Sequence, residues 1–240
     1  MSTDDAWSGL VTRVHRTERD LPARRGQVKA VVVHTTGSGI VLKALKRDED
    51  PLAYAAAYYR GRRAYASHYL VGHDFTRADA IVGTVPENLV AYHAGVGRKL
   101  AAMYRQGLGV WDTARKGPDG LSTGPEPLGR YSDWRERWPG LDGPHGLIKL
   151  RAGVNAQTVG VDFLAPEPGE RHSDLQIRWV AALVRDVLER HGVPLAKGAV
   201  LRHADIDPIN RTSKRGGWDP PRYAFEALCE HLGIESWPSP

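Results

Sequence analysis

Two histidines stand at the ends of short apolar runs, where a side chain can be rigidly held and still reach a site. His34 follows the apolar run 31–33, and His203 follows Val200-Leu201-Arg202, whose first two residues are apolar. A strand end holds its side chain at the rim of a sheet, which suits a preorganised site. The two histidines lie 169 residues apart (203 − 34), so only the fold can bring them together. Chance placement in a core or at a rim is the alternative that this pair leaves open.

A carboxylate downstream of His203 could complete a metal site. Asp205 and Asp207 follow His203 closely, and Asp219 comes directly before Pro220 at the predicted start of a helix. Two imidazoles, one carboxylate and one open position describe a catalytic zinc site rather than a closed structural one. Asp219 could instead be the N-cap of that helix, so its type and position alone leave its role open.

Short runs rich in β-branched and apolar residues are predicted to be the strands that position these side chains. They comprise residues 28–33, 67–71, 80–85, 158–163 and 199–201. The polar turn after residue 71 favours a hairpin between the second and third runs. Residues 35–39, which contain two glycines, are expected to form a loop after the first strand.

Capping residues and apolar periodicity predict three helices. They span residues 50–59, the segment from Ser173 to a stop at Gly192, and the segment from Pro220 to a stop at Gly233. Strands that alternate with helices predict an α/β fold, a single domain with a central mixed β-sheet flanked by helices.

The predicted domain covers residues 28–235, after an N-terminal extension of residues 1–27 that could include a short helix around residues 7–14. Residues 97–146 collect Gly, Pro, Trp and Arg with little periodicity. We expect a long insertion there, either a functional loop or a segment with small helices of its own.

Composition excludes several classes of protein. The 240-residue chain is 41% hydrophobic and 25% charged, which excludes wholesale disorder and a fibrous repeat. The longest apolar run, residues 52–59, has eight residues, and a membrane span needs roughly 18. Cys229 is the single cysteine, which excludes an internal disulfide and a multi-thiolate zinc site.

The charge balance is mildly basic, with 33 Lys and Arg against 28 Asp and Glu, a net charge of +5. This excess suits an anionic partner such as a wall polymer. No aromatic residues interleave with the dense basic spots at 60–63 and 211–215, so we expect no nucleic-acid binding. The acidic first residues contain no apolar segment, so we expect cytoplasmic synthesis without a signal peptide.

The sequence resembles the zinc-dependent N-acetylmuramoyl-L-alanine amidases, a family that includes phage amidase-type lysozymes, a bacterial wall-recycling amidase and animal peptidoglycan-recognition proteins. Five blocks carry the resemblance in the family's order: residues 31–36, 67–74, 91–95, 155–162 and 203–208. Each block alone is loose, but five in order are specific. The resemblance implies an amidase-like α/β fold over most of residues 28–225.

This resemblance implies that His34 and His203 are zinc ligands. The family's third ligand is an Asp or Cys some eight to ten residues after the second histidine, usually followed by Pro. Ser213 stands at that spacing here, and the Asp-Pro pair arrives later, at Asp219 and Pro220. We therefore expect Zn²⁺ to be held by His34, His203 and Asp219. Either aspartate just after His203, or loss of the ligand, is the alternative.

The family's catalytic acidic residue is a Glu at a strand end, and this chain has Asp162 there. The resemblance implies a general base for water, and a polar strand-end residue is the alternative. The family's lysine two residues before the last ligand is replaced by Gly217. Arg215 is our candidate to polarise the carbonyl in its place, with Arg211 and Lys214 as alternatives.

Tyr92 and His93 match a family block that lines the substrate groove. We expect them to bind substrate, or His93 to lie beside the ligands, rather than to bind metal. His68 is expected to be structural. The remaining histidines with no such context are expected on the surface: His15, His145, His172, His191 and His231.

Taken together, the residues and the resemblance predict a zinc hydrolase that cleaves the amide bond between N-acetylmuramic acid and L-alanine in peptidoglycan. A catalytically inactive peptidoglycan-binding protein on the same fold is the main alternative, since Asp162, the displaced third ligand and the missing lysine depart from the family. An unrelated zinc amide hydrolase is a third. The expected partners are peptidoglycan or muropeptides, with a monomeric chain and no stable membrane insertion. A recycling enzyme, an endolysin released to the wall and a delivered toxin all fit this pattern.

Overall fold

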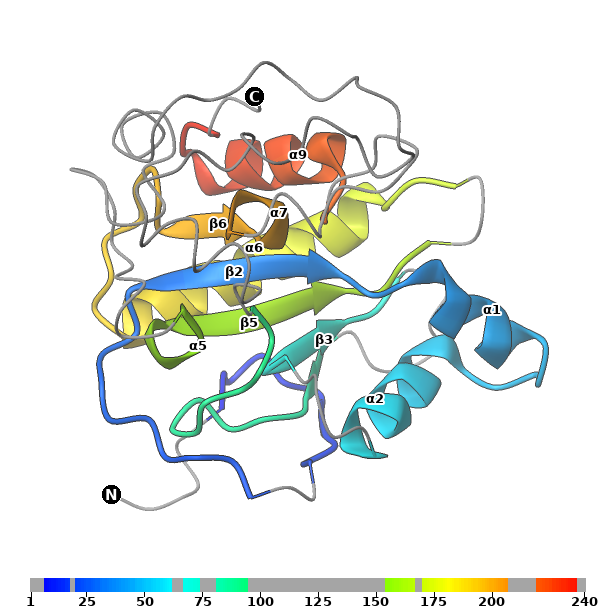
Figure 1. The fold of residues 1–240 in the computed structure, drawn as a ribbon. Helices are drawn as coiled ribbons and strands as arrows, with labels where there is room; N and C mark the ends of the chain where they lie inside the picture. Colours follow the sequence, from blue (N-terminus) through cyan, green and yellow to red (C-terminus); the bar gives the residue numbers. More distant parts are fainter. Residues whose placement is uncertain are drawn as a thin grey trace, which may run out of the picture.

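A mixed β-sheet forms the centre of the molecule in the computed structural model (Figure 1). The structure describes residues 7–17, 20–61, 67–73, 81–94, 154–166, 170–206 and 219–236. The predicted insertion at 97–146 therefore lies outside the described residues.

The sheet has six strands in the order β1-β4-β3-β5-β2-β6. Their bounds are β1 (Arg13–Val14), β2 (Ala30–Thr35), β3 (Tyr69–Val71), β4 (Ile81–Gly83), β5 (Thr158–Phe163) and β6 (Val200–Arg202). Strands β3 and β4 pair antiparallel, as the predicted hairpin requires, and the other neighbouring strands pair parallel. The predicted central mixed sheet is confirmed.

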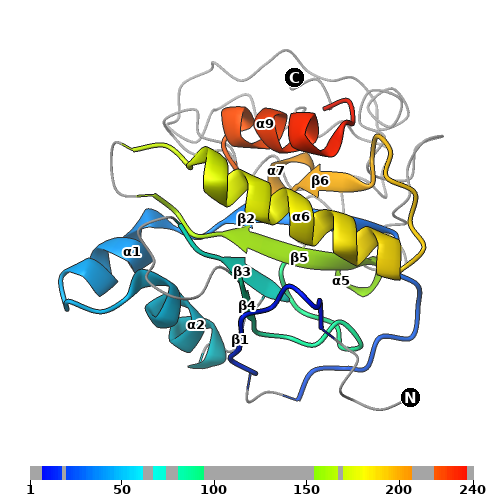
Figure 2. The same ribbon diagram turned by 180° about the vertical axis from the view of Figure 1, so that it is seen from behind.

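Helices flank this sheet. Their bounds are α1 (Ser38–Leu45), α2 (Pro51–Gly61), α5 (Val154–Gln157), α6 (Asp174–Arg190), α7 (His203–Ile206) and α9 (Arg222–Leu232). The long helix α6 crosses one face of the sheet with α9 beside it (Figure 2), and α1 and α2 lie together beyond the end of β2 (Figure 1). None of the helices that the structure describes has the length and apolar character needed to cross a bilayer.

Two of the predicted helices, α2 and α6, begin at their predicted capping residues. The Ser173 hydroxyl accepts a hydrogen bond from the backbone N–H of Gln176 at 3.2 Å, and the Asp50 carboxylate accepts one from Ala53 at 2.8 Å. Gly233 ends α9 with φ of 72°, a left-handed conformation that costs glycine little. Helix α1 was not predicted: its N-cap, Gly37, makes no side-chain hydrogen bond, so no capping side chain marks its start.

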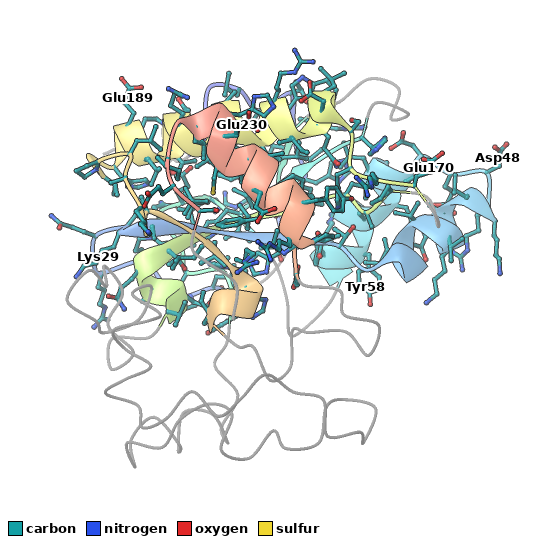
Figure 3. The ribbon with its side chains drawn as sticks, turned by 90° about the horizontal axis from the view of Figure 1, so that it is seen from above. Lys29, Asp48, Tyr58, Glu170, Glu189 and Glu230 are labelled. Atoms are coloured by element: carbon teal, nitrogen blue, oxygen red, sulfur yellow. The ribbon has the colours of Figure 1, made fainter. Side chains whose placement is uncertain are left out.

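Successive side chains of the strands lie on opposite faces of the sheet, and the two faces have different surroundings. On one face, Val31 and Val33 of β2 and Val161 of β5 pack in the core cluster that includes the apolar stripe of α6. Because successive strand residues point to opposite faces, His34 and Asp162 belong to the other face. The labelled side chains of Lys29, Asp48 and Glu189 point outward from the ribbon (Figure 3).

Part of the N-terminal segment belongs to the sheet. The helix predicted near residues 7–14 is wrong, because residues 13–14 form β1 and pair parallel with β4. Trp7 packs edge-on against Tyr69, with ring centroids 6.1 Å apart. It also fills the space beside Gly83, where an added Cβ would lie 2.5 Å from its ring. Long-range pairing and packing thus override the local pattern here.

Candidate metal centre

The ends of three neighbouring parallel strands bring His34, Asp162 and His203 to one edge of the sheet. His34 of β2 is registered directly with Asp162 of β5, and His203 follows the last residue of β6, which pairs with Val33. His34 and Asp162 are each 4% exposed and His203 is 1% exposed. In open sheets with parallel strands, ligands bind outside the carboxyl ends of the strands, and these side chains occupy that position.

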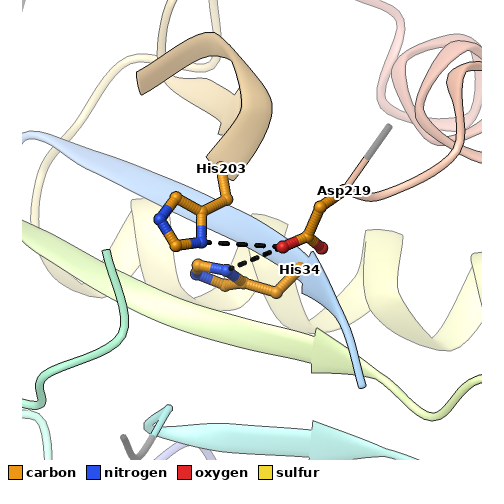
Figure 4. A group of neighbouring side chains, drawn as sticks. All are labelled: His34, His203 and Asp219. Atoms are coloured by element: carbon orange, nitrogen blue, oxygen red, sulfur yellow. Dashed lines mark ion pairs between the residues drawn. The ribbon is translucent and has the colours of Figure 1, made fainter. Parts of the chain in front are cut away.

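Asp219 reaches the two histidines from the segment before α9 (Figure 4). One carboxylate oxygen, Oδ2, lies 3.6 Å from Nδ1 of His203 and 4.0 Å from Nδ1 of His34. The other, Oδ1, accepts a hydrogen bond from the backbone N–H of Thr35 at 2.5 Å. The alternative role of Asp219 as the N-cap of α9 is wrong, because Pro221 is the N-cap residue.

This donor set fits a zinc ion. The ligand atoms of His34, His203 and Asp219 all lie within 4.8 Å of one another. Two ligand atoms bound about 2.1 Å from a tetrahedral zinc ion lie about 3.4 Å from each other. A small movement of the three side chains toward one another would bring their ligand atoms to this separation. Two neutral imidazoles and one carboxylate are a known donor combination for catalytic zinc, and they leave a fourth position open.

An open pocket of about 450 Å³ surrounds these side chains. Its lining includes the three possible ligands, Asp162, His93, Lys43, Tyr58, Tyr59 and Ser67. Tyr58 projects from α2 on the side of the ribbon away from α6 (Figure 3). The pocket thus joins the strand ends to the helical pair α1 and α2, and its volume is in the range of small-molecule sites.

Tyr59 is a pocket residue that the sequence did not point to. Its hydroxyl donates a hydrogen bond to the carboxylate of Asp162. Burial first, and then the charges of Asp162 and Asp219, raise the pKa of Tyr59, so the phenol keeps its proton. The local pattern placed Tyr59 in a helix rich in Ala and Tyr, but only tertiary packing could show which of these tyrosines meets Asp162.

His93 lies against the back of His34 rather than in open solvent. Its Nδ1 is 3.0 Å from Nε2 of His34, and its Nε2 is 3.1 Å from the hydroxyl of Thr158. Burial lowers the pKa of His93 to about 3, so its ring is neutral at neutral pH. Tyr92, predicted with it, is 45% exposed and is not among the described residues that line the pocket.

The other predicted site residues divide into two groups. Arg211, Ser213, Lys214, Arg215 and Asp207, together with the side chain of Asp205, lie outside the described residues. His68 is buried, and its Nδ1 accepts a hydrogen bond from the backbone N–H of Gly160 at 2.9 Å, which fits the predicted structural role.

The surface prediction for His172 is wrong. It is 5% exposed and lies edge-on to Phe163, with ring centroids 5.1 Å apart. Its Nδ1 is 2.8 Å from the side-chain oxygen of Gln176. The reason is the position of His172 just before α6, where the chain turns back onto the sheet.

Residues 24–217 match the family model described as N-acetylmuramoyl-L-alanine amidase. No curated protein gives a significant match.

Solved structures with similar folds include several amidases. A selenomethionine derivative of AmpD is 17% identical, with a TM-score of 0.49 over 95% of this chain and 99% of its own. The endolysin amidase LysCS from Clostridium intestinale is 15% identical, with a TM-score of 0.43 over 93% and 97%. The hydrolase AmiA from Staphylococcus aureus, in complex with its ligand, is 12% identical, with a TM-score of 0.45 over 92% and 82%.

Proposed function

Because the chain belongs to the N-acetylmuramoyl-L-alanine amidase family, we propose that it hydrolyses the amide bond between N-acetylmuramic acid and L-alanine of peptidoglycan with a zinc ion. The observation that carries the proposal is the convergence of His34, His203 and Asp219 in one pocket with Asp162. These residues come from three strand ends and from the segment before α9, so the fold itself assembles the group.

His34, His203 and Asp219 would hold the zinc. When bound, zinc supplies Lewis acidity, which lowers the pKa of water and polarises the amide carbonyl. Asp219 has a further task in the protein alone. Its Oδ1 accepts the hydrogen bond from the Thr35 backbone, which leaves Oδ2 toward the histidines and fixes the direction of the carboxylate.

Asp162 is the candidate general base. Apart from Asp219, it is the one carboxylate among the described residues that line the pocket. Asp162 on β5 is paired in register with His34 on the neighbouring strand β2, and adjacent strands lie about 4.8 Å apart. Asp162 would take a proton from the attacking water as the new C–O bond forms. It would then pass that proton to the alanine nitrogen as the C–N bond breaks, so that the amine leaves neutral.

Tyr59 supports this proton transfer by holding the base. Its phenol donates a hydrogen bond to the carboxylate of Asp162. The shorter Asp side chain, at a position where the family has Glu, thus has a partner from α2 that limits its orientations. Stabilisation of the oxyanion by Arg215 stays a prediction, because this residue lies outside the described residues.

The experiment measures zinc content and turnover on the same preparations. Purified protein is assayed for bound zinc by metal analysis and for release of a stem peptide with a free L-alanine amine from a muramoyl-peptide, followed by mass spectrometry. We expect about one zinc per chain and turnover. Asp219→Ala and His203→Ala should lose both, and Glu230→Ala, an exposed change on α9, should lose neither.

The other outcomes separate the alternatives. Binding to purified wall without zinc and without turnover would support the inactive peptidoglycan-binding protein. Bound zinc with cleavage of a different amide would support an unrelated amide hydrolase. Parallel assays on whole sacculi and on soluble muropeptides show whether intact wall or fragments are the substrate.

A further inference from the structure

A series of polar contacts leads from His34 through His93 and Thr158 into the interior of the protein. Nε2 of His34 lies 3.0 Å from Nδ1 of His93. Nε2 of His93 lies 3.1 Å from the hydroxyl of Thr158, and that hydroxyl lies 2.9 Å from the carbonyl oxygen of Val154. His34, His93 and Thr158 are each at most 5% exposed, so water does not compete freely for these contacts.

The carbonyl oxygen of Val154, at the inner end of this series, determines the direction of every hydrogen bond in the series. A carbonyl oxygen can only accept, so the Thr158 hydroxyl donates its one hydrogen to Val154 and must accept from His93. Nε2 of His93 therefore carries a hydrogen. In a neutral imidazole the other nitrogen is then an acceptor, so Nδ1 of His93 accepts from Nε2–H of His34. The remaining nitrogen of His34, Nδ1, then carries no hydrogen, and it lies 4.0 Å from Oδ2 of Asp219.

The sheet is shaped to hold His93 in this position. Gly160 lies beneath its ring, and a Cβ added there would lie 2.4 Å from Cγ and 2.6 Å from Nδ1 of His93. Any side chain at residue 160 would displace the ring. The backbone N–H of Gly160 is bonded to His68, whose ring lies edge-on to that of His93 at 5.6 Å. The imidazole is therefore confined between β5, His34 and His68.

We propose that His93 is a positioning residue that fixes His34 in the tautomer with hydrogen on Nε2, so that Nδ1 is the metal-binding atom. The metal part of this inference rests on the proposed function, whereas the tautomer is a property of the protein alone. Partners that orient a ligating histidine in this way typically contribute 10- to 100-fold, about 1.4 to 2.7 kcal/mol, to metal affinity.

The first test needs no variant and no metal. In the metal-free protein with ¹⁵N-labelled histidine, long-range ¹H–¹⁵N correlation spectra distinguish protonated from unprotonated ring nitrogens. We expect His34 to show a protonated Nε2 and an unprotonated Nδ1, and His93 to show the same. A His34 ring with its hydrogen on Nδ1, or one that exchanges evenly between tautomers, would overturn the inference.

The second test replaces the partner while keeping its volume. His93→Phe fills the same space but accepts no hydrogen bond, so we expect the single His34 tautomer to be lost and zinc affinity to fall roughly 10- to 100-fold, measured by competition with a chelator. His93→Gln offers an amide oxygen to Nε2–H of His34 and should recover a large part of the affinity. His231→Phe, a change at a histidine on α9 outside the pocket lining, is the matched control and should bind zinc as the wild type does.

The results separate this inference from the proposed function. Unchanged zinc affinity and an unchanged His34 tautomer in His93→Phe would overturn the role of His93 even if the enzyme is an active zinc amidase. Failure of the wild type to bind zinc would overturn the proposed function, and the tautomer spectra would still decide the hydrogen-bond chain. If His93→Phe does not fold, the wild-type spectra and His93→Gln still give the answer.

Discussion

At the scale of single residues, the pocket combines a carboxylate at a strand end with a phenol from a helix. Asp162 is 4% exposed and accepts a hydrogen bond from Tyr59. A buried charge needs such partners, because an unpaired carboxylate in a protein interior is costly. The hydrogen bond therefore orients Asp162 in a position where its carboxylate can accept a proton.

Asp162→Asn tests the base directly. The amide keeps the shape of the side chain and removes its basicity, so we expect zinc content to stay near that of the wild type and turnover to fall by roughly 10² or more. The measurement is kcat on a muramoyl-peptide beside metal analysis of the same sample. Near-normal kcat would show that proton transfer does not depend on Asp162.

Tyr59→Phe tests the partner of the base. The change removes one hydrogen bond to a charged group, a contact worth about 1.5–3 kcal/mol. If about half of this orients Asp162 for reaction, kcat falls roughly 3- to 10-fold while zinc content is unchanged. Tyr54→Phe, on the same helix and outside the pocket lining, is the control. Equal kcat for the two variants would assign Tyr59 a packing role only.

At the scale of elements, a buried acid fastens the end of α6 to the sheet. Glu87 is 3% exposed and accepts hydrogen bonds from Tyr69 of β3. It also accepts from Arg190 at 2.7 and 2.9 Å and from His191 at 2.6 Å. Burial raises the pKa of Glu87, but the hydrogen bonds from His191 and Arg190 lower it more, so the net shift is downward from 4.5.

Glu87→Gln should make the protein less stable, and the loss should depend on pH. A carboxyl whose folded pKa is lowered contributes stability above its unfolded value of 4.5, and this contribution is lost as pH falls through the folded pKa. We expect a loss of about 2 kcal/mol at pH 7, the scale of a charged hydrogen bond, and a smaller difference at pH 3. Urea unfolding at both pH values is the measurement.

The exposed residue Glu189 on the same helix provides the matched control for this change, and Glu189→Gln should alter stability little at either pH. A Glu87→Gln difference that stays constant between pH 7 and pH 3 would contradict the role assigned to the charge of Glu87.

At the scale of the whole molecule, the candidate metal centre joins parts of the chain that are far apart in sequence. His34 ends β2, His203 begins α7, and Asp219 precedes α9. A metal ion that binds all three binds only the folded chain, because the unfolded chain separates them. Metal binding should therefore stabilise the whole fold by mass action.

Removal of zinc should lower the melting temperature. At a free zinc concentration 100 times the Kd, the stabilisation is about 2.7 kcal/mol. For a chain of this size that corresponds to a shift of roughly 5–10 °C. Differential scanning calorimetry with zinc and with excess chelator gives the shift, and His203→Ala should show almost none. A chelator-independent melting temperature in the wild type would argue against a zinc site at these residues.

Local features of the sequence were enough to predict the parts that depend on neighbouring residues. Ser173 and Asp50 cap their helices as predicted, because capping involves residues only three apart. His34 and His203 were placed at strand ends by the apolar runs before them. The registered strands then brought those two ends together, since parallel strands present their carboxyl ends at one edge.

Only the tertiary structure decided which side chains meet across the sheet. Three contacts illustrate this: Tyr59 with Asp162, His93 with His34, and Glu87 with Arg190. The two residues of each pair are 103, 59 and 103 positions apart in the sequence. Their contacts depend on strand register and on the small volume of Gly160 beneath His93. Periodicity and capping describe a residue's own element, whereas these contacts follow from the way separate elements pack, and so the sequence predicted the elements while packing selected the partners.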